Sequence, residues 1–192
     1  MTLRAADLPP RTTPAGTPYR VAVVCLGNIC RSPMADVVVN DRLEAADLDG
    51  RVEVISAGTG GWHVGGPMDR RAAALLTTHG YDATRHRAQQ FDTGWFDDVD
   101  LVLAMDADNF QDLVALGPAD RVRMFRDFDP RASAAGARDV PDPYFGGDDG
   151  FEEVLAIVER TADALVRVLA ETLDPVVDPV VDSVVDSVEA DG

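Results

Sequence analysis

Short apolar runs rich in β-branched residues alternate with helical stretches throughout residues 19–172. Because parallel neighbouring strands need a long crossover that is usually a helix, this order predicts an α/β fold with a parallel sheet. We expect a single doubly wound domain whose four-stranded sheet carries helices on both faces. The expected strands are 20–25, 52–56, 101–105 and 122–125, and the expected helices cover about 32–48, 68–79, a segment capped by Asp106, and 152–172.

Composition divides the chain into three parts. Residues 1–18 hold four prolines without hydrophobic periodicity, which predicts a flexible N-terminal leader. Residues 19–172 form the predicted domain. Residues 173–192 contain a four-residue repeat with aspartate at every fourth place, which predicts an acidic low-complexity tail.

Charge restricts the partners. The formal net charge is -17, and all 17 basic residues are arginine. A surface of this sign disfavours nucleic acid and anionic membranes, both of which are bound through basic patches. No apolar run approaches the ~18 residues of a membrane span, and the N-terminus does not resemble a secretory signal. We therefore expect a cytoplasmic protein, with signal-independent export left open.

The segment Cys25–Pro33 reads C-L-G-N-I-C-R-S-P and joins the first predicted strand to the first predicted helix. We expect Ser32 to cap this helix and Pro33 to occupy its first position. Backbone amides in such a loop form a cradle for an anion. Gly27 can supply a positive φ for the wrapping, and the planar fork of Arg31 can hold two phosphate oxygens. The loop therefore predicts a site for a tetrahedral dianion.

Cys25 has a chemical reason to be reactive in this position. A helix N-terminus and a neighbouring arginine favour the thiolate, which is the nucleophilic form of cysteine. Ser32 can also donate a hydrogen bond to the sulfur. The chain has only two cysteines, Cys25 and Cys30, and three histidines, a poor set for zinc. We expect neither a metal nor a cofactor.

The run V-C-L-G-N-I-C-R-S-P closely resembles the phosphate-binding loop of low-molecular-weight protein tyrosine phosphatases, especially the bacterial ones. The resemblance covers residues 19–172 and continues at Ser56-Ala57-Gly58-Thr59, Trp62, Met105-Asp106 and Asp142-Pro143-Tyr144. It implies a metal-independent enzyme that hydrolyses phosphotyrosine through a cysteinyl-phosphate intermediate. The implied partners are phosphotyrosine-containing proteins, and we expect a monomer or weak dimer.

The resemblance also implies roles for individual residues. The catalytic residues would be Cys25 as nucleophile, Arg31 as phosphate clamp and Asp142 as proton donor, with Asp139 as the fallback acid. The substrate-binding residues would be Leu26, Gly27, Asn28, Ile29, Cys30, Ser32, Trp62, Tyr144 and Phe145. Ser56 and His86 would support the loop. Cys30 would form a disulfide with the nucleophile under oxidation.

Three alternatives remain. Arsenate reductases use the same scaffold, but they need cysteines beyond Cys30 to relay a disulfide. Phosphoarginine phosphatases resemble this loop but carry threonine where this chain has Ile29. A phosphate-binding module without activity would ordinarily have lost Cys25, Arg31 or Asp142, and all three are present.

Overall fold

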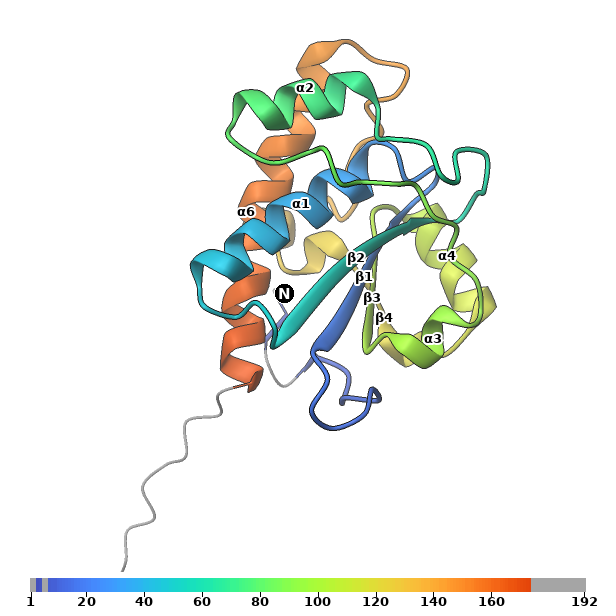
Figure 1. The fold of residues 1–192 in the computed structure, drawn as a ribbon, viewed down its shortest axis with the longest axis vertical. Helices are drawn as coiled ribbons and strands as arrows, with labels where there is room; N and C mark the ends of the chain where they lie inside the picture. The colour runs from blue at the N-terminus through green and yellow to red at the C-terminus, as the bar shows by residue number, and fades with distance from the viewer. Residues whose placement is uncertain (1–2, 5–6, 174–192) are drawn as a thin grey trace, which may run out of the picture.

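A four-stranded parallel sheet forms the centre of the molecule, in the order β2-β1-β3-β4 (Figure 1). The structure is a computed structural model that describes residues 3–4 and 7–173. The strands are β1 (Tyr19–Cys25), β2 (Val52–Gly58), β3 (Leu101–Ala104) and β4 (Val122–Met124). The predicted α/β fold with a four-stranded parallel sheet is confirmed.

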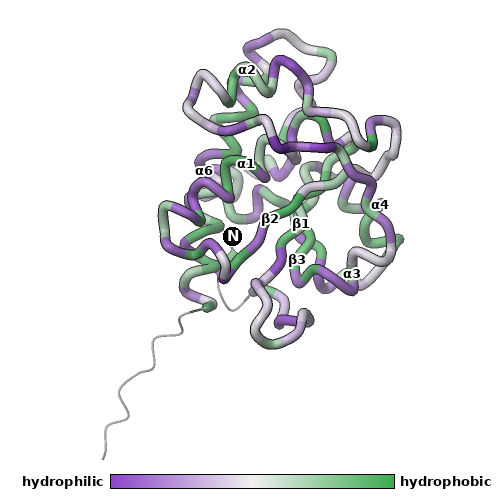
Figure 2. The backbone as a smooth tube through the Cα atoms, in the orientation of Figure 1, coloured by the Kyte–Doolittle hydropathy of each residue, from purple (hydrophilic) through white to green (hydrophobic). Residues whose placement is uncertain are grey.

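Helices cover both faces of the sheet. Successive residues of a strand point to opposite faces, so Val21 and Val23 enter one hydrophobic cluster while Ala22 and Val24 enter the other. Figure 2 shows hydrophobic segments gathered around the sheet. The first cluster includes residues of α1 (Arg31–Ala45), α2 (Arg70–Thr78) and α6 (Asp148–Leu173), and the second includes residues of α3 (Trp95–Asp98) and α4 (Ala107–Leu116).

Smaller elements complete the chain. Two 3-10 turns flank β4, at Ala119–Arg121 and Phe125–Asp127, and the short helix α5 spans Pro130–Ala135. Among the described residues, no helix combines the length and the apolar character needed to cross a membrane.

The helix starts differ from those expected. Helix α1 begins at Arg31 with Cys30 at the N-cap, so Pro33 is the third helical residue and Ser32 does not cap the helix. The Ser32 hydroxyl instead lies 3.0 Å from the sulfur of Cys25. The helix therefore begins two residues earlier than predicted, and the hydroxyl of this serine faces the nucleophile. Helix α6 begins at Asp148, also earlier than predicted.

The N-terminal segment packs against the domain, which corrects the expectation of a flexible leader for residues 7–18. The buried carboxylate of Asp100 accepts hydrogen bonds from the amides of Thr12 at 2.6 Å, Thr13 at 2.9 Å and Arg20 at 2.9 Å. Burial opposes ionisation of Asp100, but these amides outweigh it and hold the pKa of this carboxyl below its usual value. The predicted acidic tail lies outside the described residues except for Leu173.

Candidate active site

The phosphate loop, residues 26–30, follows the carboxyl end of β1 and leads into α1. Its backbone curls back over the sulfur of Cys25, which accepts a hydrogen bond from the amide of Asn28 at 3.3 Å. We expected Gly27 to supply a positive φ, but the positive φ of the loop, 53°, belongs to Asn28. Gly27 matters for another reason: a Cβ there would lie 3.3 Å from the ring of His63.

Asn28 is the centre of the hydrogen bonds that hold this loop. Its side-chain amide donates to the hydroxyl of Ser32 at 2.9 Å, and its side-chain oxygen accepts from the amide of Gln89 at 2.8 Å. Its backbone carbonyl lies 2.8 Å from Nε2 of His86, which places the proton on that nitrogen. Burial lowers the pKa of His86, which favours this neutral donor. His86 therefore contacts the loop directly, and Gln89 is a loop contact that sequence reasoning missed.

Ser56 supports the loop less directly than expected. Its hydroxyl donates to Asp36 of α1 at 2.8 Å and makes no hydrogen bond to residues 26–30. The close contact in this strand comes two residues later, because a Cβ on Gly58 would lie only 2.8 Å from the carbonyl oxygen of Leu26. The end of β2 therefore lies so close to the phosphate loop that only glycine fits at position 58.

Arg31 lines the pocket, although its side chain is only 3% exposed. Its Nη1 donates to the carboxylate of Asp106 and, at 3.2 Å, to the carbonyl of Val140. Its Nη2 donates to Asp142 at 2.7 Å. Burial disfavours the charge, but nearby anions including Cys25 and these carboxylates outweigh it and raise the pKa of Arg31. The guanidinium is thus a fixed cation whose orientation is set from two sides.

Asp106 has two partners. Its Oδ1 accepts from the amide of Asn109 at 2.8 Å, which confirms that Asp106 caps α4. Its Oδ2 accepts from Arg31, an orienting contact that sequence reasoning missed. Both contacts follow from the position of Asp106 two residues after β3, at the same sheet edge as the phosphate loop.

Asp142 belongs to the acid loop, which we define as residues 141–147. Its Oδ1 accepts from the amide of Tyr144 at 3.0 Å, while its Oδ2 pairs with Arg31. The side chain is 43% exposed and lines the pocket. The fallback acid, Asp139, instead accepts a hydrogen bond from the amide of Ala107 at 3.1 Å. Of these two carboxylates, only Asp142 lines the pocket.

Cys30 is the second cysteine of the loop and lines the pocket while remaining buried. Desolvation, followed by the charges of Asp69, Cys25 and Asp142, raises the pKa of this thiol to about 12. Cys30 is therefore protonated at neutral pH. Both cysteines are free, with no disulfide between them.

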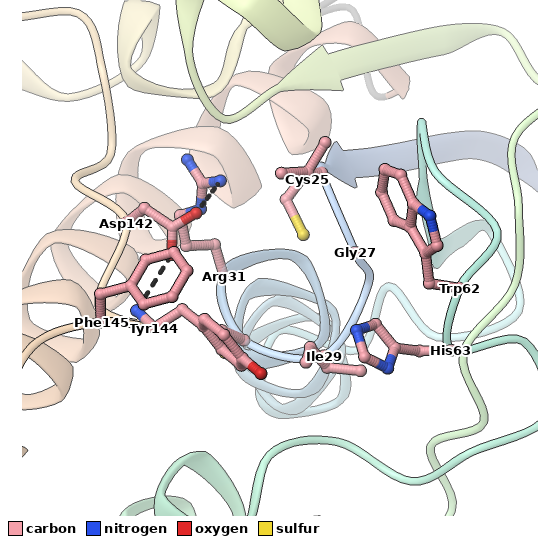
Figure 3. Close-up of a pocket in the computed structure, with 11 residues that line it drawn as sticks. Cys25, Gly27, Ile29, Arg31, Trp62, His63, Asp142, Tyr144 and Phe145 are labelled. Carbon is pink, nitrogen blue, oxygen red and sulfur yellow. Dashed lines mark hydrogen bonds and ion pairs between the residues drawn. The ribbon is translucent and has the colours of Figure 1, made fainter.

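The pocket opens above the sulfur of Cys25, between two sets of side chains (Figure 3). Trp62 and His63 stand on one side, and Tyr144 and Phe145 stand on the other. Trp62 is 74% exposed and Phe145 is 97% exposed, so both rings are open to a ligand. The pocket is lined by Cys25, Leu26, Gly27, Ile29, Cys30, Arg31, Trp62, His63, Asp142, Tyr144 and Phe145.

Two predicted substrate-binding residues do not line the pocket. Asn28 and Ser32 are fully buried and support the loop from behind. His63 was not predicted to line the site, although its place beside Trp62 in a glycine-flanked segment was a usable signal. The lining residues combine a thiol, a guanidinium, a carboxylate and aromatic rings, a set suited to an aryl phosphate.

Comparison with known proteins agrees with this chemistry. Residues 20–174 match the family model "Low molecular weight phosphotyrosine protein phosphatase". A low molecular weight protein-tyrosine-phosphatase of Streptomyces coelicolor is 49% identical over 160 residues, which cover 81% of this chain and 96% of that protein. Low molecular weight protein-tyrosine phosphatase A of Mycobacterium tuberculosis is 48% identical over 149 residues, covering 77% and 90%.

Solved structures give the same result for the fold. YfkJ from Bacillus subtilis superposes with a TM-score of 0.76 at 32% identity, covering 82% of this chain and 98% of that one. A protein tyrosine phosphatase from Entamoeba histolytica has a TM-score of 0.74 at 32% identity, covering 79% and 97%. The chain belongs to the low molecular weight phosphotyrosine protein phosphatase family.

Proposed function

We propose that this chain hydrolyses phosphotyrosine in proteins, with Cys25 as nucleophile, Arg31 as phosphate clamp and Asp142 as proton donor. One observation carries the proposal. The sulfur of Cys25 lies at the base of the pocket within hydrogen-bonding distance of the Asn28 amide and the Ser32 hydroxyl, while Arg31 and Asp142 line the same pocket. The Asn28 amide donates to this sulfur, and in the 3.0 Å contact with Ser32 either the sulfur or the hydroxyl can be the donor.

In the first step the thiolate of Cys25 attacks the phosphorus. A sulfur–phosphorus bond forms, the bond to the tyrosyl oxygen breaks, and this oxygen takes the proton of Asp142. Arg31 pairs with Asp142 when no phosphate is present. A bound phosphate dianion engages the guanidinium in place of that carboxylate.

In the second step water attacks the cysteinyl-phosphate. Asp142, now ionised, takes a proton from the water as the oxygen–phosphorus bond forms. The sulfur leaves as a thiolate and inorganic phosphate is released, which regenerates the starting state. The Ser32 hydroxyl and the Asn28 amide, both near the sulfur, make it a better leaving group. Each step therefore has an identified proton donor or acceptor.

The pocket walls support an aromatic ester as substrate. Trp62 and Tyr144 offer ring faces for a tyrosyl group, and such contacts contribute about 0.5–1.5 kcal/mol beyond burial. Ile29 adds an apolar side chain to the pocket floor, which disfavours the strongly polar guanidino group of phosphoarginine. These walls favour phosphotyrosine over both phosphoserine and phosphoarginine.

The test is turnover of three peptides that differ only in the phosphorylated residue. We expect kcat/KM to be highest for phosphotyrosine, with activity retained in the presence of a chelator. Cys25→Ser should abolish turnover, while calorimetry still detects binding of inorganic phosphate. Higher kcat/KM for phosphoarginine, or turnover by Cys25→Ser, would contradict the proposal.

A further inference from the structure

We propose that Arg71, oriented by Asp69, is a positioning residue that holds the acid loop in place for catalysis. Arg71 is the second residue of α2 and does not line the pocket. The inference rests on the proposed role of Asp142, because a loop needs positioning only if it carries the acid.

Arg71 contacts the acid loop at two backbone positions. Its Nη2 donates to the carbonyl of Tyr144 at 2.9 Å, and its Nη1 donates to the carbonyl of Gly146 at 3.1 Å. The guanidinium also lies over two aromatic rings, 6.0 Å from the centroid of Tyr144 and 4.5 Å from that of Phe151 in α6. One planar side chain therefore ties the loop to both α2 and α6.

Asp69 orients this guanidinium and joins it to the phosphate loop. Arg71 donates from Nε and Nη2 to the two carboxylate oxygens of Asp69, at 3.1 and 3.0 Å. The hydrogen bond from Arg71 is the main cause that lowers the pKa of Asp69. The amide of Asp69 donates to the carbonyl of Ile29 at 2.7 Å. A continuous path of hydrogen bonds thus connects the phosphate loop, Asp69, Arg71 and the acid loop.

The position of Asp142 depends on this path. Its Oδ1 accepts from the amide of Tyr144, and the carbonyl of that same residue accepts from Arg71. Within the part of the chain that the structure describes, hydrogen bonds reach residues 142–146 from outside the acid loop only through Arg31 and Arg71. A bound phosphate takes over Arg31. The hydrogen bonds from Arg71 then remain to hold the acid loop while the proton is transferred.

This reasoning predicts a specific kinetic defect. A misplaced acid slows the departure of a poor leaving group, whereas a good leaving group departs without protonation. Arg71→Met keeps an apolar side chain near Phe151 and removes every guanidinium hydrogen bond. We expect it to lower kcat/KM for phenyl phosphate by roughly tenfold to a hundredfold. For 2,4-dinitrophenyl phosphate we expect a change within about twofold, because leaving-group protonation is not needed there.

The control is the neighbouring Arg70, which is exposed and also on α2. Arg70→Met also removes one positive charge from α2, and we expect it to leave kcat/KM unchanged for both substrates. Binding of inorganic phosphate should be similar in both variants, which shows that the phosphate loop is intact. Arg71→Lys keeps the charge without the fork, and it serves as the second variant if Arg71→Met does not fold; it should show the same selective defect.

The outcomes separate this inference from the proposed function when Asp142→Asn is measured alongside. If Asp142→Asn selectively slows phenyl phosphate and the Arg71 variants do not, the positioning role is wrong and the proposed function stands. Equal losses on both substrates in the Arg71 variants would also overturn the positioning role. If Asp142→Asn itself shows no leaving-group dependence, the assignment of the acid fails, and this inference fails with it.

Discussion

Arg31 and Asp142 form an ion pair inside the pocket, with Nη2 of the guanidinium 2.7 Å from Oδ2 of the carboxylate. The proposed phosphate clamp and the proposed acid therefore contact each other before substrate arrives. The incoming phosphate must compete with this carboxylate for the guanidinium. Binding of phosphate and readiness of the acid are thus coupled through one contact.

Asp142→Asn should separate these two effects. Removing the competing charge frees Arg31, so the inhibition constant of inorganic phosphate should fall roughly twofold to fivefold, the value of a partly exposed ion pair. Loss of the proton donor should lower kcat/KM for phenyl phosphate roughly 100-fold to 1,000-fold. Both constants come from one steady-state inhibition experiment. Weaker binding of phosphate in the variant would show that the pair does not oppose ligand binding.

Gly58→Ala should damage the phosphate loop from the adjacent strand. The added methyl group would lie 2.8 Å from the carbonyl oxygen of Leu26 and 3.0 Å from the amide nitrogen of Asn28, so the loop must move. We expect the free energy of unfolding to fall by about 1–3 kcal/mol and kcat/KM to fall at least about tenfold. Gly150→Ala is the control, because its Cβ would make only ordinary contact with Pro143. Unchanged turnover in Gly58→Ala would contradict this close approach.

Asp36 predicts a pH dependence of stability. Burial, opposed by hydrogen bonds from Ser56 and Asn40, raises the pKa of this carboxyl to about 6. The folded protein therefore binds more protons than the unfolded chain between about pH 4 and pH 6, and stability falls as pH rises through that window. The loss attributable to Asp36 is up to about 3 kcal/mol.

The Asp36→Asn variant checks this assignment by denaturant unfolding at several pH values. The difference in unfolding free energy between variant and wild type should change across this window and level off above it. A constant difference at all pH values would mean that Asp36 titrates normally.

Asp100 predicts a pH dependence of stability in the opposite direction to that of Asp36. Its pKa is lowered in the folded state, so its contribution is present above the unfolded value of about 3.9 and is lost as pH falls through the folded pKa. Asp100→Asn should lower the free energy of unfolding by about 3 kcal/mol at neutral pH, because charged hydrogen bonds to Thr12, Thr13 and Arg20 weaken. The penalty should shrink in acid. An unaffected stability at neutral pH would show that the N-terminal segment is not held by this carboxylate.

Features that depend on neighbouring residues are predictable from this sequence, whereas those that depend on distant residues are not. The strand–loop–helix order and the places of Cys25 and Arg31 in it can be predicted from the sequence, because the pattern that indicates them lies within one short segment. The left-handed conformation at Asn28 was assigned to Gly27 because glycine is the default for positive φ, while the hydrogen bonds that stabilise this asparagine come from distant residues.

Contacts between residues that are far apart in the sequence are harder to predict. The bonds of His86 and Gln89 to Asn28 join segments about sixty residues apart, and no local pattern fixes such a pairing. The same holds for the packing of residues 7–18, whose prolines suggested flexibility while Asp100, far along the chain, supplies the anchor. Arg71 was overlooked because its partners lie in the acid loop and in α6.

The most direct test concerns the covalent intermediate on the nucleophile. An acid quench of the protein during turnover of an aryl phosphate, followed by peptide mass spectrometry, locates any phosphate bound to cysteine, and the Cys25→Ser variant serves as the blank. We predict phosphate on Cys25 and none on Cys30, whose thiol has a pKa of about 12 and stays protonated at neutral pH. Phosphate on Cys30, or phosphate bound covalently by the Cys25→Ser variant, would contradict the mechanism.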